Sequence, residues 1–261
     1  MRLRKTWWVL AALAAAALGI IAGSLPFVPA AYLASVVEGA TSGRVILAET
    51  AGTVWNGSAR VALTNVARTE TRRFAVLPGT IAWQFDEVGL APVRVALRVG
   101  GTGAVQKPFR IAWSLAGLNV EPGGLRVPAP LLETIGAPFN TLRPGGELTL
   151  TWDTLSWRPG NAQGGVAGTL VLDWTDARSA ASPVAPLGSY RLTARGEQTQ
   201  VMVDLATITG PLVLSGSGQW TMQHGMQFHG EARAEPARRA ELAPLIGLLG
   251  RRSANGAELR F

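Results

Sequence analysis

The sequence has no cysteine, and only two of its 261 residues are histidine. Without cysteine there are no disulfide bonds, cysteine-ligated metals or cysteine nucleophiles, so stability must come from packing and strand hydrogen bonds. His224 and His229 are five residues apart on an expected strand or turn, where they would face opposite sides. We therefore interpret both as exposed polar residues and expect no shared metal site.

Other catalytic patterns are missing as well. The sequence contains no phosphate-binding glycine loop, no dinucleotide fingerprint and no zinc-ligand spacing. The run Ser215–Gly218 is not a G-x-S-x-G nucleophile elbow, because it is not on the strand-to-helix turn that the elbow needs. Carboxylates such as Asp173 and Asp176 would point to opposite faces of a strand. These absences predict a protein that is not an enzyme and that holds no cofactor.

Lysine is scarce, because Lys5 and Lys107 are the only lysines among the 24 basic residues. The formal net charge is +7, and it is spread as single residues and pairs without a block of five like charges. No basic helix interleaved with aromatics is present, so we predict no nucleic-acid partner. Attraction to anionic lipid headgroups stays open.

No charge occurs between Lys5 and Glu38. A helix over residues 7–25 would be about 28 Å long, which is close to the thickness of the hydrocarbon core of a membrane. The residues expected to anchor it are Trp7, Trp8, Leu10, Leu13, Leu18, Ile20, Ile21 and Leu25. The topology charges Arg2, Arg4 and Lys5 precede it, so residues 1–6 should be a cytoplasmic stub and the rest should be exported.

A cleaved signal peptide is the alternative interpretation of this segment, with 22–24 as a small-residue cleavage site. The length of the apolar run, the Leu25-Pro26 pair that follows and the interfacial pair Trp7-Trp8 favour an uncleaved anchor. A buried core helix is a third interpretation, and the basic flank argues against it.

After the anchor, residues 26–42 are expected to form a short helical stalk, with a helix over Pro29–Gly39. Its apolar stripe should consist of Tyr32, Val36 and Val37. Two further helices are expected within the exported domain, over Pro128–Gly136 and Glu235–Gly250.

Residues 43–261 are otherwise typical of an antiparallel β-rich domain. About a dozen segments alternate apolar and polar residues, and glycine or proline separates them. The expected strands are 44–48, 59–65, 80–86, 93–99, 109–115, 147–155, 166–174, 190–194, 200–207, 212–221, 227–233 and 258–261. The fold class is therefore mainly β, as a curled sheet or a sandwich, with possible sub-halves 43–127 and 137–261.

Six of the nine tryptophans fall in or close to these strands: Trp83, Trp113, Trp152, Trp157, Trp174 and Trp220. Most of them are expected to pack on a sheet face or in a core. The other interpretation is an apolar groove for a lipid or a partner.

The segment Ala51–Ala59 has the sequence AGTVWNGSA. The pair Asn56-Gly57 suits a type I′ hairpin turn in which Gly57 adopts a positive φ, while Trp55 packs on the sheet. We interpret this motif as a structural hairpin corner, and a partner contact is the alternative.

With these features the chain resembles the type II secretion system protein N family. The resemblance covers the N-terminal anchor, the helix near Leu25–Leu33 and several short strings in the strands. The motif positions, taken as structural, are Gly52, Trp55, Asn56, Gly57, Pro144, Gly146, Leu148, Gly168, Trp174, Gly210 and Gly216. The resemblance implies a periplasmic β-rich domain on a single-pass inner-membrane anchor, and it carries no enzymatic residues.

Two functional hypotheses follow. In the first, which the resemblance implies, the protein is an accessory component that supports export of folded proteins across the outer membrane, with other type II secretion components as partners. In the second, it is an envelope module that handles lipid in an apolar β-groove. Alternating strands with their apolar residues inward suit a groove and an ordinary core equally well.

Overall fold

The computed structural model describes residues 27–64, 74–90, 92–135, 139–160, 164–253 and 256–260. The described chain is mainly antiparallel β-structure, as predicted, and all of its strands belong to one 18-stranded sheet. The expected membrane anchor at residues 7–25 lies outside the described residues. Within the described ranges no helix has the length and hydropathy needed to span a bilayer.

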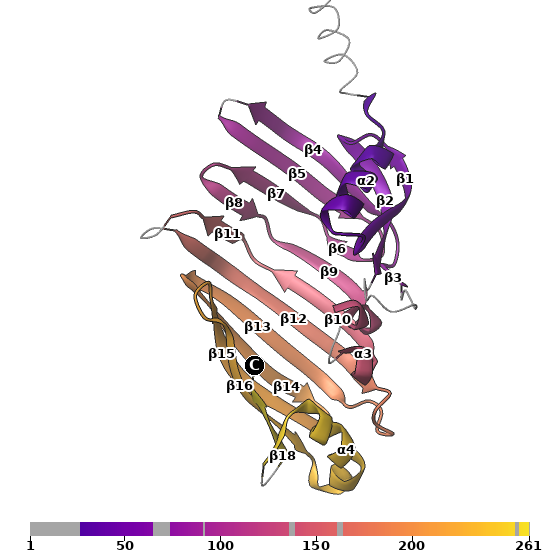
Figure 1. Ribbon diagram of the computed structural model, residues 1–261, viewed down its shortest axis with the longest axis vertical. Coiled ribbons are helices and arrows are strands. Elements are labelled where there is room, and N and C mark those ends of the chain that lie inside the picture. Colours follow the sequence, from indigo (N-terminus) through magenta and orange to yellow (C-terminus); the bar gives the residue numbers. More distant parts are fainter. Residues whose placement is uncertain are drawn as a thin grey trace, which may run out of the picture.

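The first half of the chain begins with one helix and continues as strands (Figure 1). Its elements are α2 (Ala30–Ala40), β1 (Val45–Gly52), β2 (Asn56–Thr64), β3 (Phe74–Val76), β4 (Ile81–Leu90), β5 (Val93–Gly101), β6 (Val105–Lys107), β7 (Phe109–Ser114), β8 (Gly117–Val120) and β9 (Gly123–Pro128). Two helical turns follow, η2 (Ala129–Ile135) and α3 (Phe139–Leu142), close to the helix expected at Pro128–Gly136.

The second half contains the longest strands. Its elements are β10 (Pro144–Trp152), β11 (Leu155–Arg158), β12 (Gly165–Ser179), β13 (Gly188–Gln198), β14 (Gln200–Thr209), β15 (Leu212–Thr221), β16 (Gly225–Ala234), η3 (Pro236–Arg238), α4 (Arg239–Leu249), β17 (Arg251–Ser253) and β18 (Gly256–Arg260). The helix expected over Glu235–Gly250 is therefore present as η3 and α4, and it continues past Pro244.

The strands form a meander in which neighbours along the chain are mostly neighbours in the sheet. The sheet continues across the helical insertion between β9 and β10, because these strands pair with Val127 opposite Leu148. Thus no break in pairing separates the two expected sub-halves. In the described part of the chain, β1 pairs only with β2 and β17 only with β18, so these two strands are edges of the sheet; the short strands β3 and β6 also pair on one side only.

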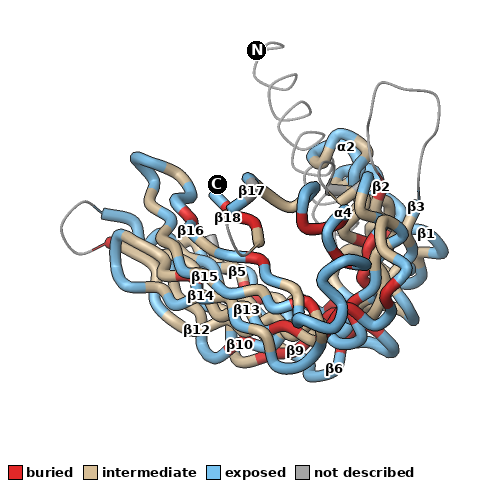
Figure 2. Tube along the Cα trace, turned by 90° about the horizontal axis from the view of Figure 1, so that it is seen from below, coloured by how far each residue is buried: buried red, intermediate tan, exposed pale blue. Residues whose placement is uncertain are grey.

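The sheet is bent into a trough (Figure 2). Seen along its length, strands β9, β10 and β12 to β16 form a curved floor, and α2, α4, β17 and β18 lie on its concave side. In Figure 1 the helices follow one another along a single side of the sheet, at the same ends of the strands. The opposite strand ends carry no helix among the described elements.

The first helix packs on the concave face near β2 and β4. Ala30 is 1% exposed and forms a small cluster with Ala59 and Trp83, against which Leu33 also packs. The predicted apolar stripe of Tyr32, Val36 and Val37 is wrong at Tyr32 and Val36, whereas Val37 is half-buried. Tyr32 is 63% exposed and Val36 is 49% exposed, because Ala30 and Leu33 are the residues of α2 that pack against the sheet.

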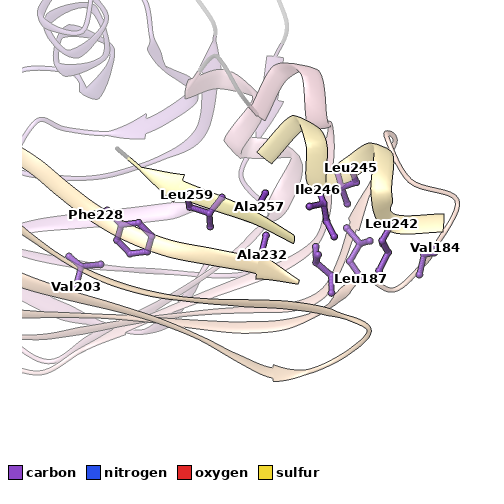
Figure 3. Packing of buried hydrophobic residues seen from close by; sticks show 11 residues of the cluster. Val184, Leu187, Val203, Phe228, Ala232, Leu242, Leu245, Ile246, Ala257 and Leu259 are labelled. Carbon is purple, nitrogen blue, oxygen red and sulfur yellow. The ribbon is translucent and has the colours of Figure 1, made fainter. Parts of the chain in front are cut away.

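The larger core lies under α4 (Figure 3). Leu242, Leu245 and Ile246 point from α4 toward the sheet, where they pack with residues of β14, β15, β16 and β18 and of the segment before β13. The sheet-side and loop residues of this cluster are Val184, Leu187, Val203, Leu212, Phe228, Ala232, Ala257 and Leu259. Leu242, Leu245 and Ile246 are buried, and Leu249, which continues the same helical spacing, is partly buried against the cluster.

Candidate functional site

The two faces of the sheet differ sharply in chemistry. On β12 the residues Leu170 and Leu172 lie opposite Ala194 and Leu192 of β13, so apolar pairs occupy one face. The next residue, Asp173, pairs with Arg191 on the other face. Because side chains alternate along a strand, this pattern separates an apolar face from a polar one. The apolar face is the concave one, since α4 packs on it.

Cross-strand register joins the apolar residues into continuous rows that run across the sheet. One row passes through Phe85, Leu97, Ile111, Val120, Leu155, Gly168, Gly196, Val201, Trp220 and Met226. A second row beside it passes through Trp152, Leu170, Ala194, Val203, Gly218 and Phe228. We call the concave face that these two rows define the apolar trough. Every member of both rows is aliphatic, aromatic, methionine or glycine.

The convex face carries ion pairs between neighbouring strands. The guanidinium of Arg191 binds both carboxylate oxygens of Asp173, at 2.6 and 2.9 Å. The hydrogen bonds and the charge of Asp173 raise the pKa of Arg191. Similar pairs join Arg98 to Asp86 and Arg126 to Glu147. Exposed pairs of this kind contribute little stability, but they show that this face is solvated. A sandwich would need a second sheet packed on the apolar face, whereas all the described strands belong to one sheet, so the curled-sheet alternative describes the fold.

Most of the trough is covered only partly. Under α2 and α4 its residues are buried, whereas in the middle of the sheet side chains such as Leu97, Ile111 and Leu172 are half-buried. Toward the strand ends farthest from the helices, Trp113 and Trp157 are each 43% exposed. Contiguous apolar surface of this kind marks a binding surface for a lipid or a protein. The trough is therefore the candidate functional site.

Three tryptophans of the trough each donate an indole hydrogen bond to a backbone carbonyl oxygen. The indole Nε1 of Trp83 donates to the carbonyl oxygen of Val54 at 2.8 Å, and its ring fills the space that a side chain at Gly57 would need. Trp152 likewise donates to Glu121 and lies over Gly123. The indole of Trp174 donates to Gly145 at 3.0 Å. Each buried indole N–H thus has a partner, as such groups require.

The prediction that Asn56-Gly57 forms the hairpin turn, with a positive φ at Gly57, is wrong. Both residues belong to β2, and the positive φ of the hairpin, 81°, is at Gly52 instead. Gly57 is required for a different reason, because a Cβ there would lie 2.7 Å from the ring of Trp83. Trp55 lies in the turn and its ring meets that of Phe85 edge-on, with centroids 5.6 Å apart.

The other motif positions are distributed over the sheet and do not form one site. Gly146, with a φ of 100°, lies at a bulge of β10, and Leu148 two residues later is buried opposite Trp174. Gly168 and Gly210 also have positive φ values. The remaining positions, Pro144 and Gly216, lie in β10 and β15. Their surroundings are backbone turns, bulges and close strand contacts.

The geometry offers little that could perform catalysis. His224 lies in the turn before β16, and His229 is an exposed residue of β16. Among the residues that the structure describes, no three histidine, aspartate or glutamate side chains are grouped so as to hold a metal ion. In the same part of the chain no buried side-chain nitrogen or oxygen lacks a hydrogen-bond partner. The apolar side chains of the trough suit apolar groups, and its buried polar atoms already have partners within the described residues.

Tyr190 is the ionisable residue most affected by the fold. Its hydroxyl donates to the carbonyl oxygen of Leu212 at 2.9 Å, and burial raises its pKa well above the ordinary value. An unfolded tyrosine ionises near pH 10, so above that pH only the unfolded chain releases this proton. Stability from neutral Tyr190 is therefore fully present below about pH 10 and declines as the pH rises further.

We expect this decline to depend on Tyr190 itself. The variant Tyr190→Phe should lose about 1 kcal/mol of unfolding free energy at neutral pH, for one hydrogen bond. It should then lose less stability than the wild type between about pH 9 and about pH 11. Urea unfolding followed by circular dichroism at several pH values measures both effects. Equal slopes for the two proteins would show that Tyr190 does not cause the alkaline loss.

Together, these features define a single-sheet β protein with one solvated face and one apolar, partly open trough. A family model for type II secretion system protein N matches residues 43–260. The chain therefore belongs to that family, as its motifs predicted, and the match spans the whole sheet. Neither the curated proteins nor the solved structures contain a match to this chain. Membership assigns the protein to the type II secretion system of the cell envelope.

Proposed function

We propose that this protein is a non-enzymatic accessory component of the type II secretion machinery, anchored in the inner membrane with its sheet in the periplasm. The observation that carries the proposal is the family match over residues 43–260. The basic start and the uncharged apolar segment at residues 7–25 support the anchor and its orientation. In this role the sheet would help folded proteins to cross the outer membrane.

The edges of the sheet support contacts with other secretion components. An edge strand presents unpaired backbone groups, to which a strand of another protein can add. β1 is such an edge, and its pairing with β2 shifts register between Ala48 and Ala51. At the other edge β17 has only three residues, and β18 pairs with only four of the ten residues of β16. Among the described residues this leaves 225–228 of β16 accessible to a partner strand on that side.

A second candidate function is lipid handling in the envelope. One observation favours it, namely the row from Phe85 to Met226, which crosses the sheet without a polar side chain. A protein that needed only a stable core would gain by covering this row, because exposed apolar area forgoes about 25 cal/mol per Å² of burial. An acyl chain lying in the trough would cover it instead.

A deletion strain tests the two candidates together. We expect loss of the gene to trap folded exoproteins in the periplasm, while the outer membrane still excludes large hydrophobic antibiotics. Fractionation with activity assays of a secreted enzyme measures the first effect, and antibiotic sensitivity measures the second. Complementation with the wild-type gene on a plasmid is the control.

The opposite pattern would overturn the secretion proposal. Normal secretion with a leaky outer membrane would favour lipid handling as the primary function. If neither phenotype appeared, both candidates would fail as roles that the cell requires under these conditions.

A further inference from the structure

The trough contains a partly open cavity where it passes beneath α4. The cavity has a volume of about 510 Å³. This is within the range of about 300–1,000 Å³ that is usual for small-molecule sites. Its walls come from α3, α4, the strands β10, β12, β13, β15 and β18, and the segment before β13. The lining includes Trp174, Tyr190, Leu214, Leu248 and Arg178.

The lining of this cavity is almost entirely apolar. Most of its residues are leucine or another apolar type, and the polar atoms of its tryptophan and tyrosine already form hydrogen bonds. The indole of Trp174 donates to Gly145, and the hydroxyl of Tyr190 donates to Leu212. A peptide placed here would leave its backbone groups without hydrogen bonds, which costs several kcal/mol for each group. The chemistry therefore fits an acyl chain and not a polypeptide.

Two residues of the lining are exposed, one apolar and one positively charged. Leu248 of α4 is 56% exposed although its neighbours on the helix, Leu245 and Ile246, are buried. Arg178 is the single charged residue of the lining, it is exposed, and within the described residues it forms no ion pair. An apolar cavity with an unpaired guanidinium among its lining residues is complementary to an amphiphile with an anionic head.

We propose that this cavity binds one acyl chain of an anionic phospholipid, with Arg178 attracting the headgroup. Trp174, Tyr190 and Leu214 belong to the apolar face of the sheet, so the cavity is continuous with the trough, along which the second chain of the lipid would lie. The proposal rests on the second candidate function and adds to it a defined site and a ligand class.

Photolabelling of the full-length protein in vesicles tests the site. The probe is phosphatidylglycerol with a diazirine on an acyl chain, and labelled peptides are mapped outside residues 1–26. We expect labelling in α4, β12 and β15. The variant Leu248→Trp should reduce this labelling about tenfold, because the larger ring excludes about two buried methylenes from the cavity. Since Leu248 is exposed, the ring can enter without overpacking the core.

The matched control is Leu115→Trp, which makes the same change at a residue that is 69% exposed and does not line the cavity. It should label like the wild type. Arg178→Gln should lower phosphatidylglycerol labelling about fivefold, as expected for the loss of one charge near an anionic headgroup, and should leave phosphatidylcholine labelling unchanged. Arg195→Gln, an exposed arginine of the convex face, controls for net charge. Circular dichroism of every variant checks that it is folded.

Each remaining outcome contradicts the proposal in a distinguishable way. If Leu248→Trp labels like the wild type, the cavity is not the site, although lipid handling in the open trough survives. Labelling by diazirine-palmitate but not by the phospholipid would identify a free fatty acid as the occupant and overturn the phospholipid. If nothing outside residues 1–26 is labelled, both the site and the lipid-handling candidate fail, whereas the secretion proposal depends only on the deletion strain.

Discussion

Replacing Trp83 with alanine is expected to lower the free energy of unfolding by about 3–5 kcal/mol, as for other buried aromatic residues. Trp83 is 7% exposed and packs with Ala30 of α2 and Ala59 of β2. Its indole also holds the turn between β1 and β2 through the carbonyl oxygen of Val54. Removing the ring therefore opens a cavity beside Gly57 and leaves that carbonyl without its donor.

Two further variants separate these effects. Trp83→Phe keeps an aromatic ring but removes the N–H, so we expect a smaller loss of about 1–3 kcal/mol. Trp113→Ala makes the same large-to-small change at a residue that is 43% exposed, and it should cost less than half as much as Trp83→Ala. Urea unfolding of the full chain, followed by circular dichroism, measures all three. Equal losses at Trp83 and Trp113 would contradict the structural role of Trp83.

Much of the strand pattern could be predicted, because alternation is a local property. The expected strand 93–99 corresponds to β5, and 212–221 coincides with β15. The short strands β6, β8 and β9 were missed. β9 has the sequence GGLRVP, with glycine and proline where strand signals are weakest. It is a strand because β6 and β10 pair with it from both sides, which is information from distant parts of the chain.

For the Asn56-Gly57 pair, the sequence predicts a hairpin correctly but places its turn at the wrong residues. Asn-Gly favours a tight hairpin turn, and a hairpin is present, but its loop is Thr53–Trp55 and the pair belongs to the strand. The glycine is needed because the ring of Trp83 lies against it. That constraint comes from a residue two strands away in sequence, so spacing within the motif does not contain it.

The sequence predicts an open groove only as an alternative to an ordinary core, because strand alternation does not distinguish the two. A core and an open groove both require apolar residues on one face of each strand, so alternation is the same in the two cases. What separates them is whether a second layer covers that face. Among the described elements, α2, α4, β17 and β18 cover part of it, and the strand ends opposite the helices leave Trp113 and Trp157 exposed. The position of the cavity under α4 likewise depends on where that helix docks.

Replacing Leu242 with alanine is the second change for which we expect a large effect, a loss of about 2–5 kcal/mol. Leu242 is fully buried between α4 and the sheet, and it is one of the two largest side chains with almost no exposure. The variant should loosen α4, so protection from hydrogen exchange should fall in residues 239–249 before it falls in β12 and β13.

Leu248→Ala provides the matched control, because it removes the same atoms from the same helix at a residue that is 56% exposed. With little area to lose, it should stay within about 1 kcal/mol of the wild type. Hydrogen exchange combined with urea unfolding compares the two variants directly. If α4 is instead a weakly attached element that the sheet does not need, Leu242→Ala would change exchange in 239–249 but not the unfolding midpoint. A fall in the midpoint with Leu242→Ala alone would show that the helix closing the cavity is also part of the cooperative core, so that a ligand bound beneath it would stabilise the whole sheet.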